Sequence, residues 1–146
     1  MTSLVLPRLK TKARFLMIGY GLILLIWMSL EDRGTLTVSL LGTGAAIIYI
    51  GFWLINRYSD RELDFHLWFT GIVLSGTVIG AASAFTAAML MFFKSGWHGH
   101  LYPDYPPQLI ASMLSRMPVW AISGTLIGLF CAIVILLRQS NPQTQQ

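Results

Sequence analysis

Hydrophobic residues fall into four long runs along the chain, each of about the length needed to cross a membrane as a helix. The runs cover residues 15–30, 36–55, 67–93 and 117–137, and none of them contains Asp, Glu, Lys, Arg or His. A helix needs about 20 apolar residues to cross the hydrocarbon core of a bilayer. The first run reaches that length when Ala13 and the aliphatic part of Arg14 are included. We therefore predict transmembrane helices at about 13–30, 35–56, 66–93 and 117–138.

The polar stretches between these runs are too short to form a second domain. We expect residues 1–146 to form a single all-α integral membrane domain, a bundle of four transmembrane helices. A basic arm at 1–12 precedes the bundle, and a polar tail at 139–146 follows it. A cleaved signal peptide is the alternative for the first run, but bulky Trp27 and Met28 and acidic Glu31 stand where cleavage needs small residues. The first helix is therefore predicted to be retained.

The short connections predict where the helices turn. Glu31-Asp32-Arg33-Gly34 is a short polar connector, so the first two helices are expected to form a tight antiparallel hairpin. Ser59-Asp60-Arg61-Glu62 has the spacing of a capping box, which predicts that the third helix begins near Asp60. We expect that helix to end at about Lys94, with Gly96 in the left-handed conformation that closes many helices.

The longest connection, residues 95–116, is predicted to contain a short helix. Pro107 suits the first position of a helix, and an amphipathic pattern follows it. The apolar face contains Leu109, Ile110, Met113 and Leu114. This pattern is typical of an amphipathic helix that lies in the membrane interface between the third and fourth spans. Trp97, Tyr102 and Tyr105 are expected in an aromatic belt at the same level.

Composition and charge agree with a membrane protein and add a topology. The chain is 55% hydrophobic and only 11% charged, against about 25% charged in ordinary soluble domains. This excludes a soluble globule, a disordered tail and a basic nucleic-acid-binding domain. With four spans, one side of the membrane receives most of the basic residues, and the positive-inside bias places both termini in the cytoplasm. The basic residues on that side are Arg8, Lys10, Lys12, Arg14, Arg57, Arg61 and Arg138; the other side has Arg33, Lys94 and Arg116.

Small residues recur at four-residue spacing in the third and fourth runs. Gly76, Gly80 and Ala84 are spaced in this way in the third run, and Gly124 and Gly128 in the fourth. Small residues let membrane helices approach closely, so these positions predict a packing seam between the two helices. The alternative is a surface that binds another protein or a second copy of the chain.

Few residues could carry chemistry. The absence of ionisable side chains from the four runs argues against a proton-coupled carrier. His66 is a candidate axial ligand for a pigment-type cofactor, although the sequence requires no cofactor. His98, His100 and Asp104 are candidate ligands of a metal ion such as zinc or copper. A haem held by two histidines of one chain is excluded, because His66 and the other two are predicted at opposite ends of the bundle.

The sequence contains none of the common catalytic or nucleotide-binding motifs. We therefore expect a non-enzymatic protein that is an accessory, assembly or stabilising subunit of a larger membrane complex. Its expected partners are the lipid bilayer and other membrane subunits or further copies of itself, with no nucleic acid. One alternative is an oligomeric channel or facilitator. A third is a metal-dependent enzyme that uses the loop with His98, His100 and Asp104 at the level of the lipid headgroups.

Overall fold

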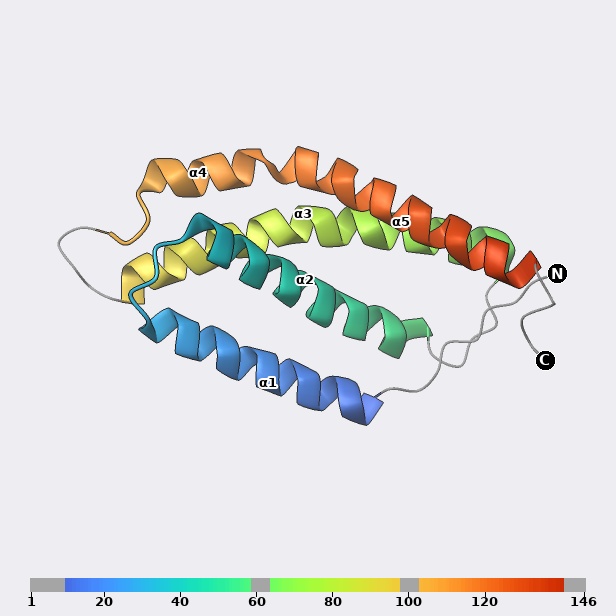
Figure 1. Ribbon diagram of the computed structural model, residues 1–146, viewed down its shortest axis with the longest axis horizontal. Coiled ribbons are helices and arrows are strands. Elements are labelled where there is room, and N and C mark those ends of the chain that lie inside the picture. The colour runs from blue at the N-terminus through green and yellow to red at the C-terminus, as the bar shows by residue number, and fades with distance from the viewer. Residues whose placement is uncertain (1–9, 59–63, 98–102, 141–146) are drawn as a thin grey trace.

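The computed structural model describes residues 10–58, 64–97 and 103–140, and within these residues all regular structure is helical. The five helices are α1 (Lys10–Ser29), α2 (Thr35–Tyr58), α3 (Phe65–Trp97), α4 (Pro107–Ser115) and α5 (Met117–Ser140). Figure 1 shows an elongated bundle in which the chain direction alternates from α1 to α2 to α3, and α4 and α5 then run back along α3. We call the end that carries residues 30–34 and 103–106 the loop end, and the opposite end the terminal end.

The predicted helices are found in the described residues. Three helical stretches are long and apolar enough to span a membrane, namely Thr35–Tyr58, Phe65–Trp97 and Pro107–Arg138. The apolar part of α1, Ala13–Ser29, is shorter. Residues 30–34 join α1 to α2 directly, which confirms the predicted tight hairpin.

Helix α3 ends later than its sequence pattern predicts. Its 33 residues end at Trp97, which corresponds to a length of about 50 Å. Gly96 lies within the helix and does not take the left-handed conformation, so the predicted closure at that residue is wrong. The last turns are instead held by two tertiary hydrogen bonds: Lys94 donates to the carbonyl of Asp32, and Ser95 Oγ accepts from the backbone N–H of Tyr105. The predicted capping box at residues 59–62 lies outside the described residues, and the described helix begins at Phe65.

Helix α4 forms where the sequence predicts it but has a different orientation. Pro107 occupies its first turn, after an extended Pro106. Figure 1 shows α4 lying along α3 and leading almost directly into α5, not across the end of the bundle as an interfacial helix would. Its apolar face packs against the core, because Met113 is buried and Leu109, Ile110 and Leu114 contact the core cluster. The interfacial orientation predicted from the amphipathic pattern is therefore wrong: α3 is long enough to offer this face a protein surface.

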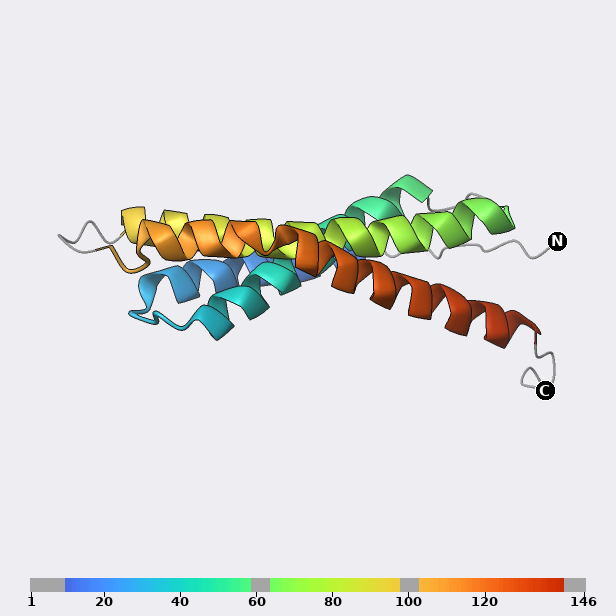
Figure 2. The same cartoon turned by 90° about the horizontal axis from the view of Figure 1, so that it is seen from above.

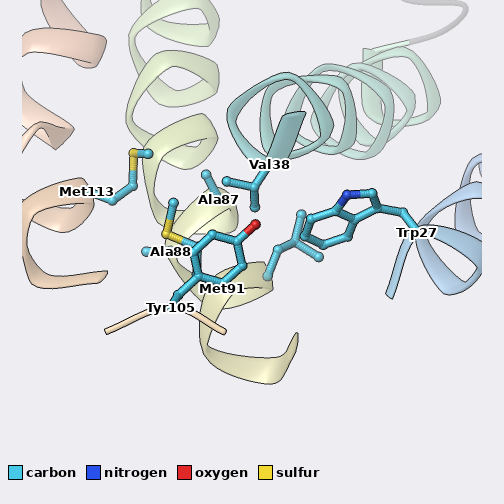
Figure 3. Close-up of a cluster of buried hydrophobic side chains, with 8 residues drawn as sticks. Trp27, Val38, Ala87, Ala88, Met91, Tyr105 and Met113 are labelled. Carbon is cyan, nitrogen blue, oxygen red and sulfur yellow. The ribbon is translucent and has the colours of Figure 1, made fainter. Parts of the chain in front are cut away.

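Helix α3 is the centre of the bundle. It packs most extensively against α5 and then against α2, whereas α1 packs mainly against α2. The core cluster lies at the loop end, and Figure 3 shows most of its side chains converging from four helices and from the segment before α4. The cluster consists of Trp27, Val38, Ala87, Ala88, Leu90, Met91, Tyr105 and Met113.

Helices α1 and α2 are packed much less tightly toward the terminal end, whereas Trp68 of α3 and Ala132 of α5 are still buried. No described residue of α2 after Ala46 is buried, and Trp27 is the only buried residue of α1 between Ala13 and Ser29. Figure 1 shows α1 and α2 diverging from α3 and α5 toward this end. Figure 2, at a right angle, shows that α5 also separates from α3 toward the terminal end. The bundle is thus closed at the loop end and splayed at the terminal end.

Candidate functional site

The loop end is organised around Lys94, whose side chain is completely buried. Its Nζ donates hydrogen bonds to the carbonyl oxygens of Asp32, at 2.7 Å, and Trp27, at 3.3 Å. The same nitrogen lies 4.0 Å from the centroid of the Trp27 ring. Carbonyl acceptors and an aromatic face both stabilise a cation that has lost its water. Lys94 therefore joins α3 to the end of α1 and to the turn that follows it.

The turn itself is shaped by the Asp32 carboxylate. One oxygen accepts a hydrogen bond of 2.8 Å from the backbone N–H of Gly34, and the other accepts one of 3.1 Å from Trp27 Nε1. The first of these bonds, followed by the bond from Trp27, lowers the pKa of the Asp32 carboxyl below its ordinary value. Trp27 therefore serves both residues: its indole N–H binds Asp32 and its ring lies beneath Lys94.

Tyr105 brings the segment before α4 into the same cluster. Its backbone N–H donates to Ser95 Oγ at 3.0 Å, and its hydroxyl donates to the carbonyl of Asp32 at 3.4 Å. Figure 3 shows the hydroxyl pointing toward Val38 and Trp27. Burial, together with the negative charges of Asp32 and Asp104, raises the pKa of the Tyr105 hydroxyl to about 12. Tyr105 is only 1% exposed, so its prediction as a belt residue is wrong, whereas Trp97 is exposed; Tyr102 lies outside the described residues.

The candidate metal ligands are placed only in part. Asp104 is buried, and its Oδ1 lies 3.3 Å from Nε of Arg33 in an ion pair. His98 and His100 lie outside the described residues, so the metal site stays a prediction. Among the residues that the structure describes, no three His, Cys, Asp or Glu side chains are grouped closely enough to hold a metal ion.

His66 lies at the terminal end, in the first turn of α3. Its side chain is exposed, and its ring meets the ring of Phe65 edge-on with centroids 5.4 Å apart. The candidate cofactor ligand is thus close to the start of α3 and far along the bundle from the Lys94 cluster, and its role stays a prediction.

The glycines selected from the sequence lie at the contact between α3 and α5. A methyl group added to Gly76 would collide with the backbone of Gly124, and one added to Gly80 would collide with the carbonyl oxygen of Trp120. Gly128 would meet the carbonyl oxygen of Ile72 at 2.9 Å. Ala84 is buried farther along α3. The two backbones thus approach as closely as membrane helices do at small residues, and a hydrogen bond of 2.7 Å between the hydroxyls of Thr77 and Thr125 crosses the same contact.

The structure also has a close contact that the sequence analysis did not single out. A methyl group added to Gly42 of α2 would lie only 2.6 Å from the backbone nitrogen of Ala87 in α3. By contrast, a methyl group added to Gly51, farther along α2, would have no atom within 4 Å. Gly51 lies on the opposite face of the helix, and the buried residues of α2, namely Val38, Gly42, Ala45 and Ala46, all lie in its loop-end half.

A groove of about 530 Å³ follows α3 between α2 and α5. Its walls include Ile47 of α2, Ile79 of α3 and Ile127 of α5, and the glycines of the α3–α5 contact form part of its lining. Its lining hydroxyls are bonded to carbonyl oxygens of their own helices. The bonded pairs are Thr43 with Ser39, Ser75 with Ile72, Ser83 with Ile79 and Ser123 with Val119. The groove therefore presents an apolar surface in spite of its hydroxyl groups.

The residues of the loop-end cluster were not recognised from the sequence as a unit. The sequence pattern indicates only that Lys94 lies near the end of a helix. Its partners are backbone carbonyls, which leave no pattern in the sequence. The one available signal was Asp32 two residues before Gly34, a spacing at which an aspartate often bonds to a nearby backbone N–H in a turn.

Comparison with known proteins adds no family to this description: no family model, no curated protein and no solved structure matches the chain.

Proposed function

We propose that this chain is an integral membrane protein with four spans, α1 being the first, and that it acts as a non-enzymatic accessory subunit of a larger membrane complex. The apolar length of α2, α3 and the α4–α5 stretch supports three of the spans. The tight hairpin to α2 supports the fourth, because it keeps α1 beside α2 with its apolar side chains exposed. The distribution of basic residues favours cytoplasmic termini, which places the terminal end on the cytoplasmic side.

The observation that best supports the accessory role is that the buried ionisable groups Lys94 and Asp104 contact other groups of the same chain. Lys94 is bonded to two backbone carbonyls, and Asp104 is paired with Arg33. Both are the kind of buried group that marks catalytic or transport sites when it is free to react. Here they connect α1, α3 and the segment before α4, so their chemistry is structural. We therefore expect a partner to bind the apolar surface of the bundle and not a reactive group.

The two alternatives receive less support. A channel needs polar groups that face its water, and the hydroxyls of the groove are bonded to their own helices. An enzyme at the lipid headgroups would depend on His98 and His100, and its third candidate group, Asp104, is already paired with Arg33.

Purification through an affinity tag in a mild detergent tests the proposal. We expect another membrane protein to be recovered with the chain at a fixed ratio, and to dissociate only when a harsher detergent is used. A chain recovered as a pure monomer or homo-oligomer under every mild condition would contradict the accessory role. Reporter fusions at each terminus test the topology separately, and both are expected to report the cytoplasm.

A further inference from the structure

The groove between α2, α3 and α5 has a length that matches one leaflet of a bilayer. Its lining residues on α3 extend from Ile72 to Ser83, which corresponds to a rise of about 16 Å. Half of the hydrocarbon core of a bilayer is about 15 Å thick. Gly80 is the middle residue of the apolar run 67–93, so most of the groove lies on the terminal side of the middle of α3. In the proposed membrane setting the groove therefore faces the acyl chains of a single leaflet.

The lining of the groove suits a hydrocarbon chain. Its volume of about 530 Å³ lies within the range of about 300–1,000 Å³ that is usual for small-molecule sites. Among the described residues that line it, Cys131 alone has an ionisable side chain. The hydroxyls of Ser75, Ser83 and Ser123 are bonded to carbonyls of their own helices. The groove therefore does not require a polar group along the length of its ligand.

A buried hydrogen-bond donor lies just beyond the terminal end of the groove. Trp68 precedes Ile72 by one helical turn and Ser75 by two, so it lies on the face of α3 that lines the groove, although it is not itself a lining residue. Trp68 is 2% exposed, and its indole Nε1 has no hydrogen-bond partner among the described residues. A buried N–H without an acceptor is costly. The ester carbonyl at the head of an acyl chain is an acceptor of the kind that this position lacks.

Basic residues stand farther along in the same direction. Arg138 follows Cys131 by seven residues, or two helical turns, and therefore lies on the side of α5 that lines the groove. It is exposed in the last turn of α5, and Arg57 is exposed in the last turn of α2. Asp64 is the one carboxylate among the described residues at the terminal end. This end of the groove therefore favours a negatively charged headgroup.

We propose that the groove binds one acyl chain of an anionic phospholipid from the leaflet at the terminal end. The phosphate then lies near Arg138, and an ester carbonyl approaches Trp68. The inference rests on the membrane insertion proposed above and not on the accessory role. A neutral phospholipid has the same acyl chains and ester carbonyls but gains no attraction to the arginine. The charge of the headgroup is therefore the property that distinguishes the proposed ligand from bulk lipid.

Binding of defined lipids to the purified full-length chain tests the proposal. The chain is stripped of lipid in a mild detergent and mixed with phosphatidylglycerol or phosphatidylcholine that has the same acyl chains. Native mass spectrometry is expected to show one phosphatidylglycerol retained per chain and weaker retention of phosphatidylcholine. Arg138→Gln should weaken phosphatidylglycerol binding about fivefold, which is the usual effect of one basic residue near an anionic membrane surface. Arg14→Gln, at the same end of the bundle but on α1, is the matched control and is expected to leave binding unchanged.

A substitution inside the groove tests its role directly. Ser123 is exposed and lines the groove, so Ser123→Leu should narrow the groove without disturbing the fold. Ser115→Leu is the matched control, because Ser115 of α4 is exposed and lies outside the lining. We expect Ser123→Leu alone to lose phosphatidylglycerol, with melting temperatures of both variants close to that of the wild type. Trp68→Phe, which removes the N–H, should weaken the binding of both lipids.

Equal retention of the two lipids by the wild-type chain, or full retention of phosphatidylglycerol by Ser123→Leu, would overturn the proposal. The reporter fusions described above separate this failure from that of the proposed function. A chain that inserts with both termini in the cytoplasm but retains no phosphatidylglycerol contradicts the lipid site alone. A chain that does not insert contradicts both the lipid site and the proposed function.

Discussion

The two halves of α2 show how differently one helix can be held within the same bundle. From Val38 to Ala46 the helix packs directly on α3, with Gly42 against the backbone of Ala87. From Ile47 to Tyr58 none of its residues is buried, and the same face exposes Tyr49 and Trp53. Both halves are apolar, so hydrophobicity does not distinguish them. The difference lies in side-chain size at the contact face, and in the polar bonds that hold only the loop end together.

This difference has a physical basis in the membrane setting that we propose. Lipid tails are as apolar as leucine, so burial of apolar surface does not draw helices together there. Close backbone contact and interhelical hydrogen bonds must do so. The loop end has both, in Gly42 and in the bonds of Lys94. The contact face of α2 has aromatic side chains in place of glycine in the terminal half, and among the described residues no hydrogen bond joins this half to α3.

The largest effect should follow from removing the bonds of Lys94. Lys94→Met keeps the length of the side chain but removes the hydrogen bonds that the ammonium group donates to the carbonyls of Trp27 and Asp32. We expect a loss of about 3 kcal/mol in the free energy of unfolding, since bonds to charged groups contribute about 1.5–3 kcal/mol each. Unfolding in mixed detergent micelles, followed by tryptophan fluorescence, measures it. Arg57→Met, at the exposed end of α2, is the control; equal stability of the two variants would show that the cluster does not hold the loop end.

Paired glycine substitutions compare the face of α2 that contacts α3 with its open face. Gly42→Ala forces a methyl group onto the backbone of Ala87, and overpacking of this kind costs about 1–3 kcal/mol. Gly51→Ala has free space and replaces glycine within a helix, so it should be neutral or stabilise the chain by up to about 1 kcal/mol. The same unfolding measurement is used for both. A similar loss in both variants would mean that the cost at Gly42 does not come from its contact with the backbone of Ala87.

Acid should weaken the loop end through Asp32. Its folded-state pKa lies below its ordinary value, so its contribution to stability is complete above the unfolded pKa, near 4, and is lost as the pH falls through the folded pKa. The wild-type chain should therefore lose stability relative to Asp32→Asn as the pH is lowered below about 4. The difference in melting temperature between the wild type and Asp32→Asn is measured from pH 7 to pH 2. A difference that stays constant over this range would show that the hydrogen bonds from Gly34 and Trp27 do not stabilise the ionised carboxylate in the folded state.

The smallest effect is expected at Tyr105. Tyr105→Phe keeps the buried ring and loses only the long bond to the carbonyl of Asp32, so we expect a cost below about 1 kcal/mol. The raised pKa, about 12, gives a second readout. Stability from the neutral hydroxyl is complete below the unfolded pKa, near 10, and is lost as the pH rises through 12. Ultraviolet titration should therefore show a late-ionising tyrosine in the wild type that the variant lacks.

The helices could be predicted from the sequence because long uncharged runs have few other stable forms. The glycines at the α3–α5 contact were also visible, since Gly76, Gly80, Gly124 and Gly128 repeat at helical spacing. The orientation of α4 was not, because an amphipathic face suits a membrane interface and a protein surface equally well. The pattern alone did not reveal that α3 extends far enough to cover that face.

The Lys94 cluster was hidden for a different reason. Its acceptors are the backbone carbonyls of Trp27 and Asp32, and every residue has such a carbonyl. Tyr105 was similarly ambiguous, because a tyrosine near a predicted membrane boundary fits both an aromatic belt and a buried anchor. Only the three-dimensional path of residues 103–106 distinguishes these roles. The exposed face at Tyr49 and Trp53 required the same information, since its spacing is that of an ordinary packed helix.

The distance between α2 and α3 at the two ends of the bundle tests the central claim most directly. Spin labels are placed at Leu40 and Phe85 near the loop end, and at Leu54 and Gly71 near the terminal end, in a Cys131→Ser background in lipid nanodiscs. Each terminal-end position lies two heptads from its loop-end counterpart and on nearly the same face of its helix, so uniformly packed antiparallel helices would give similar distances in pulsed electron paramagnetic resonance. We predict a clearly longer distance for Leu54 and Gly71. Equal distances for the two pairs would contradict a bundle that is closed at the loop end and open at the terminal end.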